Sequence, residues 1–299
     1  YRIQHHFAHI LGLMSENKVE PEEEIIGIST DGVGYGDDGN IWGGEVMLSN
    51  YKEYKRIGHL EYQPMIGGDR CTKYPARMLA SILLKELDLE EAYKIFKSLN
   101  LQSDLEYKET ELNAMISQFK QSNRQFPSKN IAFTSSTGRI FDVVSYILGL
   151  TNIKTYRGEP AMRLEGLASM GNPKNVKMQV DIIKKNGISI INSSKLVIDI
   201  LNLSKDKKNQ PKDIAAKFQI ELAKSFADLA KEVAERKGIN KIGLTGGVAY
   251  NYSFAKTVKE NIELEGLIFL EHNLVAPGDA GISTGQLVGG LYQHLKNLG

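Results

Sequence analysis

The chain has few of the features that mark disulfide-bonded, membrane-spanning or nucleic-acid-binding proteins. One cysteine, Cys71, stands among 299 residues, which excludes an internal disulfide framework and a zinc cluster built from the chain's own thiolates. No apolar run approaches the roughly 18 residues of a spanning helix. The 37 Lys and Arg residues nearly balance 36 Asp and Glu, so the net charge of +1 provides no basic field for nucleic acid.

Glycine, in contrast, is plentiful and clustered. Many of the 28 glycines sit in short groups beside apolar runs. Such groups are typical of tight turns in which backbone N–H groups approach a ligand. They fall at residues 32–39, 43–44, 67–68, 246–247 and 278–285.

Apolar runs and helical periodicities alternate along the chain and predict a mixed sheet flanked by helices, an α/β fold. The expected strands, the first two forming a hairpin, are 25–28, 41–48, 55–60, 131–133, 188–191, 196–201, 241–244 and 267–271. The expected helices are 5–15, 77–121, 140–148, 211–238, 250–260 and 280–298.

Histidines gather at the start of the chain. His5, His6 and His9 are half of the 6 histidines. On a helix, His5 and His9 lie one turn apart on the same face, so both imidazoles can bind one divalent metal, whereas His6 points about 100° away. From these residues alone, a metal site and a histidine-containing core helix remain alternatives.

Two aspartates stand beside glycine-rich turns. Asp31 ends an expected strand before Gly32, where its carboxylate can bind a metal while backbone amides approach a phosphate. Asp279 precedes the last helix, where it is either a helix cap or a metal ligand. Between a strand and a helix, the Gly246-Gly247 turn directs N–H groups toward a phosphate or ribose.

In their order along the chain, these motifs resemble those of the HypF family, the carbamoyltransferases of [NiFe]-hydrogenase maturation. The likeness is to the family's C-terminal TsaD-like domain, of the actin-like ATPase (ASKHA) architecture, and runs from Gln4 to about Gln286. The matching motifs are His-His-x-Ala-His at 5–9, Asp-Gly-x-Gly-Tyr-Gly through Trp-Gly-Gly-Glu at 31–45, Gly-Gly-Asp-Arg at 67–70, Ser-x-Gly-Arg-x-Phe-Asp at 136–142, Gly-Gly-Val at 246–248 and Asp-x-Gly-Ile at 279–282.

This resemblance implies a function. Carbamoyl phosphate is converted by ATP to carbamoyl adenylate, and this domain passes the carbamoyl group to the C-terminal cysteine of HypE, on the path to the cyanide ligands of the hydrogenase iron. The implied enzyme is cytoplasmic and uses neither nucleic acid nor a membrane.

It also implies a set of site residues. The metal, zinc or ferrous iron, would be held by His5, His9, Asp31 and Asp279. Asp69 and Arg70 belong to a signature that we assign to catalysis on the adenylate or acceptor side. The implied nucleotide-binding residues are Gly138, Asp142, Glu165, Gly246, Gly247 and Asn251.

The same resemblance suggests how the chain is divided. Residues 1–23 would be a metal-binding helix left from the first ASKHA lobe, and residues 24–299 the second lobe, with a helical insertion at about 76–122 and a C-terminal helix at about 280–298. The family's zinc modules need more cysteines than Cys71. We therefore expect a fragment or a split piece that works with upstream HypF domains, which contain acylphosphatase-like and YrdC-like parts.

The chain departs from the family at Phe7, which stands where a third consecutive histidine is usual, but Phe7 is outside the implied metal pair and does not threaten the metal site. Other functions also stay open. The metal helix and the nucleotide turn also occur in TsaD-like enzymes of tRNA threonylcarbamoylation and O-carbamoyl transfer. A non-catalytic ATP-binding module is the remaining alternative.

Overall fold

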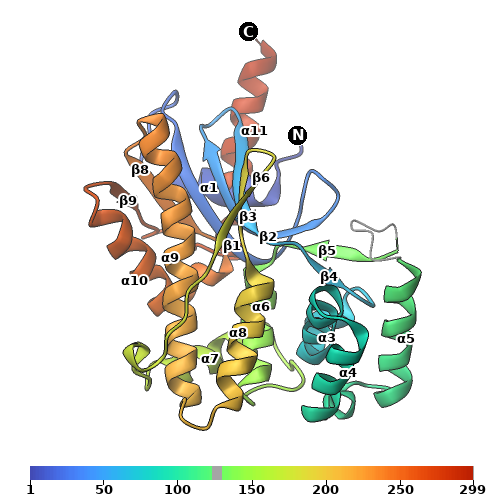
Figure 1. Cartoon of the computed structure of the whole chain (residues 1–299). Helices are drawn as coiled ribbons and strands as arrows, with labels where there is room; N and C mark the ends of the chain where they lie inside the picture. The colour runs from blue at the N-terminus through green and yellow to red at the C-terminus, as the bar shows by residue number, and fades with distance from the viewer. Residues whose placement is uncertain (123–129, 299) are drawn as a thin grey trace.

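A mixed sheet forms the centre of the molecule (Figure 1). The computed structural model describes residues 1–122 and 130–298. Within them the sheet has 9 strands, with β4 and β5 attached beside a main path in the order β6-β7-β3-β2-β1-β8-β9. The strands are β1 (Ile25–Tyr35), β2 (Ile41–Ser49), β3 (Tyr54–Leu60), β4 (Gln63–Met65), β5 (Ala132–Thr134), β6 (Ile182–Lys185), β7 (Ile188–Ile191), β8 (Lys241–Thr245) and β9 (Ile268–Leu270).

Most helices cover the two faces of the sheet, and three of them form a separate group at one side. The α-helices are α1 (His5–Glu16), α2 (Arg70–Lys73), α3 (Pro75–Glu86), α4 (Leu89–Ser98), α5 (Lys108–Gln121), α6 (Thr137–Ile147), α7 (Glu159–Ala168), α8 (Ser193–Lys205), α9 (Pro211–Lys237), α10 (Tyr252–Glu263) and α11 (Ile282–Leu298). Helices α3, α4 and α5 lie together at the lower right of Figure 1, away from α9 and α10. No helix among the described residues has the length and apolarity needed to cross a bilayer.

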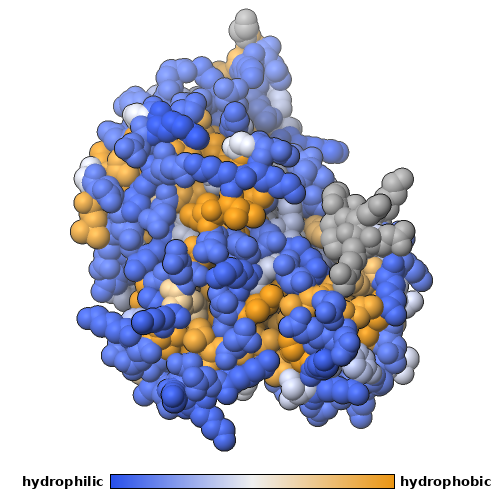
Figure 2. Space-filling model, viewed as in Figure 1, coloured by the Kyte–Doolittle hydropathy of each residue, from blue (hydrophilic) through white to orange (hydrophobic). Residues whose placement is uncertain are grey.

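The two faces of the sheet bury two separate apolar cores. β1 lies inside the sheet, where it pairs with β2 in antiparallel orientation and with β8 in parallel orientation. The larger core gathers side chains from α3, α6, α8 and α9. The smaller core joins α1 to the opposite face through residues such as Leu11, Trp42 and Met47. Apolar side chains reach the face seen in Figure 2 only in separated patches.

Close packing holds α1 between the sheet and α11. At Gly27 of β1, a Cβ would lie 2.6 Å from the side chain of Ile10, so glycine lets α1 settle onto the strand. At Gly285 of α11, a Cβ would lie 1.7 Å from the carbonyl oxygen of Ala8, so the two helices touch through their backbones. This contact fixes the first turn of α1 beside the start of α11.

One expected element has the wrong type, and others were missed. Residues 196–201 form part of helix α8 rather than a strand. The side chain of Asn192 caps that helix by accepting a hydrogen bond from the backbone N–H of Lys195 at 3.0 Å. Its buried residues include Leu196, Val197, Ile200 and Leu201, a helical spacing that is hard to recognise in a short segment rich in Leu, Val and Ile. Strand β6, strand β4 and helix α7 were not expected, and β1 continues past Asp31 to Tyr35.

Candidate metal centre and nucleotide site

Four side chains from three parts of the chain meet at one end of α1. Helix α1 supplies His5 and His9, strand β1 supplies Asp31, and the short turn η4 (Asp279–Gly281) supplies Asp279 before α11. One ligand atom from each residue lies within 4.8 Å of the others. The structure thus brings together the four residues that the resemblance implies as metal ligands.

Five of the six distances between their ligand atoms match a tetrahedral site, and the sixth, between the carboxylate oxygens of Asp31 and Asp279, is within 4.8 Å. The Nε2 atoms of His5 and His9 are 3.2 Å apart, each is 3.3 Å from Asp31 Oδ2, and each is 3.5 Å from Asp279 Oδ1. Ligand atoms about 2.05 Å from a tetrahedral zinc ion would be separated by about 3.3 Å. Only small shifts would therefore place these four atoms around one ion.

The charges of the cluster also favour a cation. Asp279 Oδ1 is buried, yet no described residue provides it with a hydrogen-bond partner. Burial alone would raise the pKa of Asp31, but hydrogen bonds with His5 and His9 and from the backbone N–H of Gly32 hold that pKa well below its usual range. Two carboxylates facing two imidazoles suit zinc or ferrous iron.

A second polar network holds the loop that carries Asp279. The Glu16 carboxylate at the end of α1 accepts hydrogen bonds from the backbone N–H groups of Asn273, at 2.6 Å, and Leu274. His272 Nδ1 lies 3.1 Å from Glu16 Oε2, and its Nε2 lies 2.9 Å from Thr245 Oγ1. Glu16 and His272 therefore tie the metal-site helix to the strand end that leads into the glycine turn.

The Gly246-Gly247 turn lies directly against the metal centre. Gly246 has a φ of +93°, and a Cβ there would lie 2.3 Å from the carbonyl oxygen of Thr30. A Cβ at Gly247 would lie 2.9 Å from Asp31 Oδ1. Only glycine permits this approach, so the turn needs both its left-handed backbone and its missing side chains.

Two of the expected nucleotide residues meet after this turn. Asn251 caps α10 by accepting a hydrogen bond from the backbone N–H of Phe254 at 2.9 Å, and its Nδ2 is buried without a partner among the described residues. Glu165 of α7 accepts a hydrogen bond from the backbone N–H of Tyr252 at 2.8 Å. Glu165 and Asn251 are thus neighbours at the start of α10.

The other two expected nucleotide residues differ in their surroundings. Gly138, in the first turn of α6, would place a Cβ 3.0 Å from the Cα of Gly32, so it is adjacent to the strand end that carries Asp31. Asp142 is only 2% exposed and pairs with Arg139 Nη1 at 2.8 Å. Burial raises the pKa of Asp142. In this structure Asp142 faces Arg139 rather than an open surface.

Arg70, beside Asp69, contacts other residues than the four metal ligands. Asp69 is exposed and precedes the short helix α2. Arg70 pairs with Glu106 at 2.5 Å and lies over the ring of Tyr107, both in the region of α5. The contacts of Arg70 are thus with the helical group at the side of the sheet, and the structure does not place Arg70 in the metal cluster.

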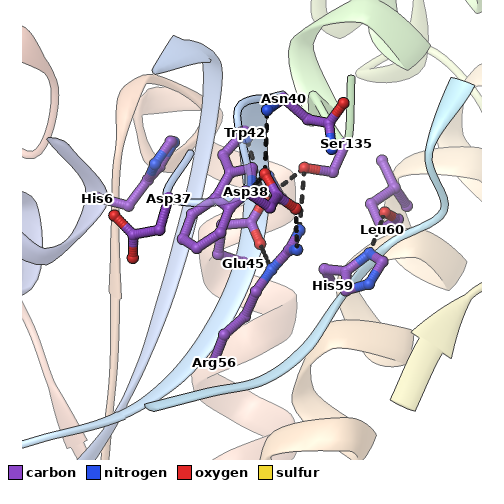
Figure 3. Close-up of polar contacts among 12 residues, drawn as sticks. His6, Asp37, Asp38, Asn40, Trp42, Glu45, Arg56, His59, Leu60 and Ser135 are labelled. Carbon is purple, nitrogen blue, oxygen red and sulfur yellow. Dashed lines mark hydrogen bonds and ion pairs between the residues drawn. The ribbon is translucent and has the colours of Figure 1, made fainter. Parts of the chain in front are cut away.

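The Trp-Gly-Gly-Glu motif takes part in a network of polar contacts around Glu45 (Figure 3). Glu45 is fully buried and accepts hydrogen bonds from Arg56 Nε at 2.5 Å and from Ser135 Oγ at 2.5 Å. The Arg56 guanidinium lies 4.1 Å from the centre of the Trp42 ring. This network joins β2 and β3 to the loop that begins α6.

The two glycines of the motif let that loop approach Asp31. A Cβ at Gly43 would lie 2.6 Å from the carbonyl oxygen of Asp31. Ser136 Oγ donates to the carbonyl oxygens of Asp31 at 3.1 Å and Gly32 at 2.7 Å. The start of α6 therefore sits directly on the strand end that supplies the metal ligand.

His6 and Phe7 occupy the other faces of α1. His6 is fully buried, and burial lowers its pKa to about 4, so the ring is neutral. Its ring lies 5.1 Å from that of His5 and 6.2 Å from that of Trp42. Phe7 is buried against Tyr54 at 4.6 Å, in the core and away from the metal cluster.

Comparisons with known proteins agree with this geometry. The family profile "Carbamoyltransferase, Kae1-like Domain, second subdomain" matches residues 27–286. A probable carbamoyltransferase HypF of Methanocaldococcus jannaschii is 40% identical over 297 residues, covering 99% of this chain and 36% of its own length. This chain belongs to the HypF carbamoyltransferase family.

Solved HypF structures share the fold. The crystal structure of full-length HypF in a phosphate- and nucleotide-bound form aligns over 99% of this chain with a TM-score of 0.86 at 29% identity, using 36% of that protein. HypF of T. kodakarensis aligns over 98% of this chain with a TM-score of 0.85 at 35% identity, using 37% of that protein. The α/β Kae1-like architecture is therefore that of HypF, and this chain spans little more than a third of the M. jannaschii relative and of these two solved proteins.

Several residues of the site had no sequence signal. Arg56 pairs with Glu45 on a neighbouring strand, and Glu16 and His272 contact each other from opposite ends of the chain. Arg157, discussed below, lies in a loop outside every motif. Nothing in their local sequence distinguishes them from surface or core residues.

Proposed function

We propose that this chain is the part of a HypF carbamoyltransferase that transfers a carbamoyl group from carbamoyl adenylate to a thiol. The acceptor in this proposal is the C-terminal cysteine of HypE, on the path to the Fe-cyanide ligands of [NiFe]-hydrogenase, and the reaction takes place in the cytoplasm. The observation that carries the proposal is the tetrahedral cluster of His5, His9, Asp31 and Asp279 beside a glycine turn at a helix start.

The chemistry needs little beyond positioning and charge stabilisation. Carbamoyl adenylate already has a good leaving group, so the acceptor thiolate attacks the carbamoyl carbon and AMP departs. A divalent ion held by His5, His9, Asp31 and Asp279 would neutralise phosphate oxygens and polarise the carbonyl. Beside it, the backbone N–H of Gly246 already donates to the carbonyl oxygen of Pro277 at 2.8 Å. The N–H of Gly247, at the start of the following helical turn, would therefore be the donor of this turn that binds phosphate.

Nucleotide recognition is assigned to the residues around the start of α10. Glu165 and Asn251 would bind the ribose and base side of ATP, because a carboxylate and a free amide Nδ2 lie together there. Gly138 lies at the strand end across from them. Asp142 would bind the nucleotide when its ion pair with Arg139 opens. Asp69 and Arg70 stay assigned to catalysis on the adenylate or acceptor side.

The acceptor thiol is assigned to a partner because Cys71, the single cysteine of the sequence, is unsuited to act as a nucleophile. Cys71 is fully buried, and burial raises its pKa to about 11. A thiol of that kind is mostly protonated at neutral pH and inert. This supports an acceptor cysteine from HypE rather than an acyl-enzyme intermediate.

The proposal includes the division of the chain. Residues 1–23 would belong to the first ASKHA lobe and residues 24–299 to the second. The family profile, whose match begins at residue 27, supports this boundary. The remaining parts of the reaction would come from upstream HypF domains or a separate chain.

A reconstituted transfer assay tests this function. A HypE C-terminal peptide is incubated with carbamoyl phosphate, ATP and either this chain alone or this chain with the upstream half of a HypF. We expect the peptide to gain one carbamoyl group, detected by mass spectrometry, only when both halves are present. His5→Gln should abolish the transfer, and the matched His59→Gln, a buried histidine outside the metal cluster, should preserve it.

Two results would contradict the proposal. Full activity from carbamoyl phosphate with this chain alone would refute the division of labour with upstream domains. Carbamoylation of tRNA in place of the peptide, or binding of ATP with no transfer to any acceptor, would refute the thiol acceptor.

A further inference from the structure

An exposed arginine stands beside the metal centre. Arg157 lies in the loop between α6 and α7, and its Nη2 pairs with Asp279 Oδ2 at 2.5 Å. Its side chain is 72% exposed. Asp279 is its only hydrogen-bonding or ion-pair partner that we find among the described residues. Most of the N–H donors of this guanidinium therefore remain free.

The two oxygens of Asp279 point to different groups. Oδ1 lies 3.5 Å from the Nε2 atoms of His5 and His9, while Oδ2 is held by Arg157. A ligand that enters the open side of the metal centre at Asp279 would thus meet the free edge of the guanidinium. Arg157 is placed where a group bound to the cluster could also touch it.

With a divalent ion in the cluster, this would be a site for an anion. Asp31 and Asp279 would bind that ion as carboxylates, and imidazoles bind a metal in their neutral form. A divalent ion in the cluster would cancel the carboxylates, and Arg157 would then leave the site with a positive charge. A guanidinium forms paired hydrogen bonds that match the geometry of a phosphoryl group.

We infer that Arg157 binds the phosphoryl group of the adenylate and stabilises it as the leaving group. This inference rests on the proposed function. In the transfer step the thiolate sulfur bonds to the carbamoyl carbon, the bond from that carbon to the phosphate oxygen breaks, and AMP leaves with the electron pair. The thiol proton passes to solvent. Charge grows on the phosphate during this step, so a fixed cation beside it favours the transition state.

A merely structural role for Arg157 makes a different prediction. If Arg157 only orients Asp279, its removal weakens metal binding, as changes around metal ligands commonly do by about 10–100-fold. If Arg157 recognises phosphate, its removal leaves the affinity for metal unchanged or raises it, because a positive charge beside the ion is lost.

Calorimetric titration of the zinc-loaded full chain separates these roles. AMP and adenosine are the probes, since they differ only in the phosphate. We expect Arg157→Ala to weaken AMP binding by about 10-fold or more, the equivalent of a charged hydrogen bond, and to leave adenosine binding unchanged. Arg157→Lys should fall between Arg157→Ala and the wild type. The control is Arg163→Ala, which removes an exposed arginine of α7 that pairs with Glu159 at 2.8 Å.

Zinc affinity, measured in competition with a chelator, completes the test. We expect Arg157→Ala to bind zinc as tightly as the wild type or more tightly. Unchanged AMP binding in Arg157→Ala, an equal loss for AMP and adenosine, or a large loss of zinc affinity would each overturn the inference while leaving the proposed function intact. A wild-type chain that binds zinc but neither AMP nor adenosine would overturn both.

Discussion

Removing one histidine from the four-residue cluster should remove most of the stabilisation that a bound metal ion provides. We choose His9→Gln because the His9 side chain is 1% exposed, and its Nε2 lies 3.2–3.3 Å from His5 Nε2 and Asp31 Oδ2. Glutamine keeps a polar group of similar length in the buried position. The expected effect is therefore on metal affinity more than on packing.

The magnitude follows from linkage. Zinc at about 100 times its dissociation constant would stabilise the wild-type chain by about 2.7 kcal/mol. For a chain of 299 residues, that corresponds to a rise in Tm of about 4 °C. Changes outside the ligand shell already cost about 10–100-fold in affinity, so loss of a ligand should cost about 100-fold or more. At the same zinc concentration, His9→Gln would then gain about 0.4 kcal/mol, and its Tm would move by about 1 °C.

Differential scanning calorimetry with and without zinc measures both shifts. The matched control is His59→Gln, which changes a buried histidine whose Nδ1 lies 2.8 Å from the carbonyl oxygen of Leu60. It should keep the full zinc-dependent rise even if its Tm without metal falls. A His9→Gln chain that keeps the wild-type rise would refute a four-ligand site at this position.

Three further predictions concern the surroundings of the site. Glu45→Gln removes the buried carboxylate that pairs with the half-buried Arg56 and leaves only the longer ion pair with Asp38 at 3.4 Å, so urea unfolding should give a loss of about 3 kcal/mol. Gly285→Ala forces a Cβ toward the Ala8 carbonyl oxygen, so thermal unfolding should show a loss of about 1–3 kcal/mol together with weaker zinc binding. Burial alone would raise the pKa of Glu16, but backbone N–H groups and His272 lower it. Glu16 therefore stabilises the fold above its ordinary pKa of about 4.3 and loses that effect as pH falls through its lowered value, so Glu16→Gln should flatten the acid limb of a pH titration of stability. No change in any of these measurements would contradict the corresponding contact.

Much of the fold could be predicted because the local signals are strong. The long helix from Pro211 to Lys237 has proline at its start, glycine after its end and apolar residues at helical spacing. The error at α8 has a physical cause, since a run of Leu, Val and Ile suits a buried strand and a buried helix face equally. The cap at Asn192 decided between them.

The candidate site could be predicted only in part. Residues within recognisable motifs, such as His5 and Asp31, were predicted as metal ligands from the resemblance to the family. Arg157 and His272 could not, because each matters through a partner more than 100 or 200 positions away, Asp279 and Glu16 respectively. Distances of that kind depend on how helices pack and leave no local pattern.

By itself the sequence determined that His5 and His9 share one face of a helix, because helical periodicity sets that spacing. It also determined where glycine permits backbone to approach a ligand, as at Gly246. Only the tertiary structure decided that Asp31 and Asp279 would meet those imidazoles, and with which oxygen atoms. That outcome depends on the register of β1 and on the backbone contact between α1 and α11, which are set by packing across the whole core.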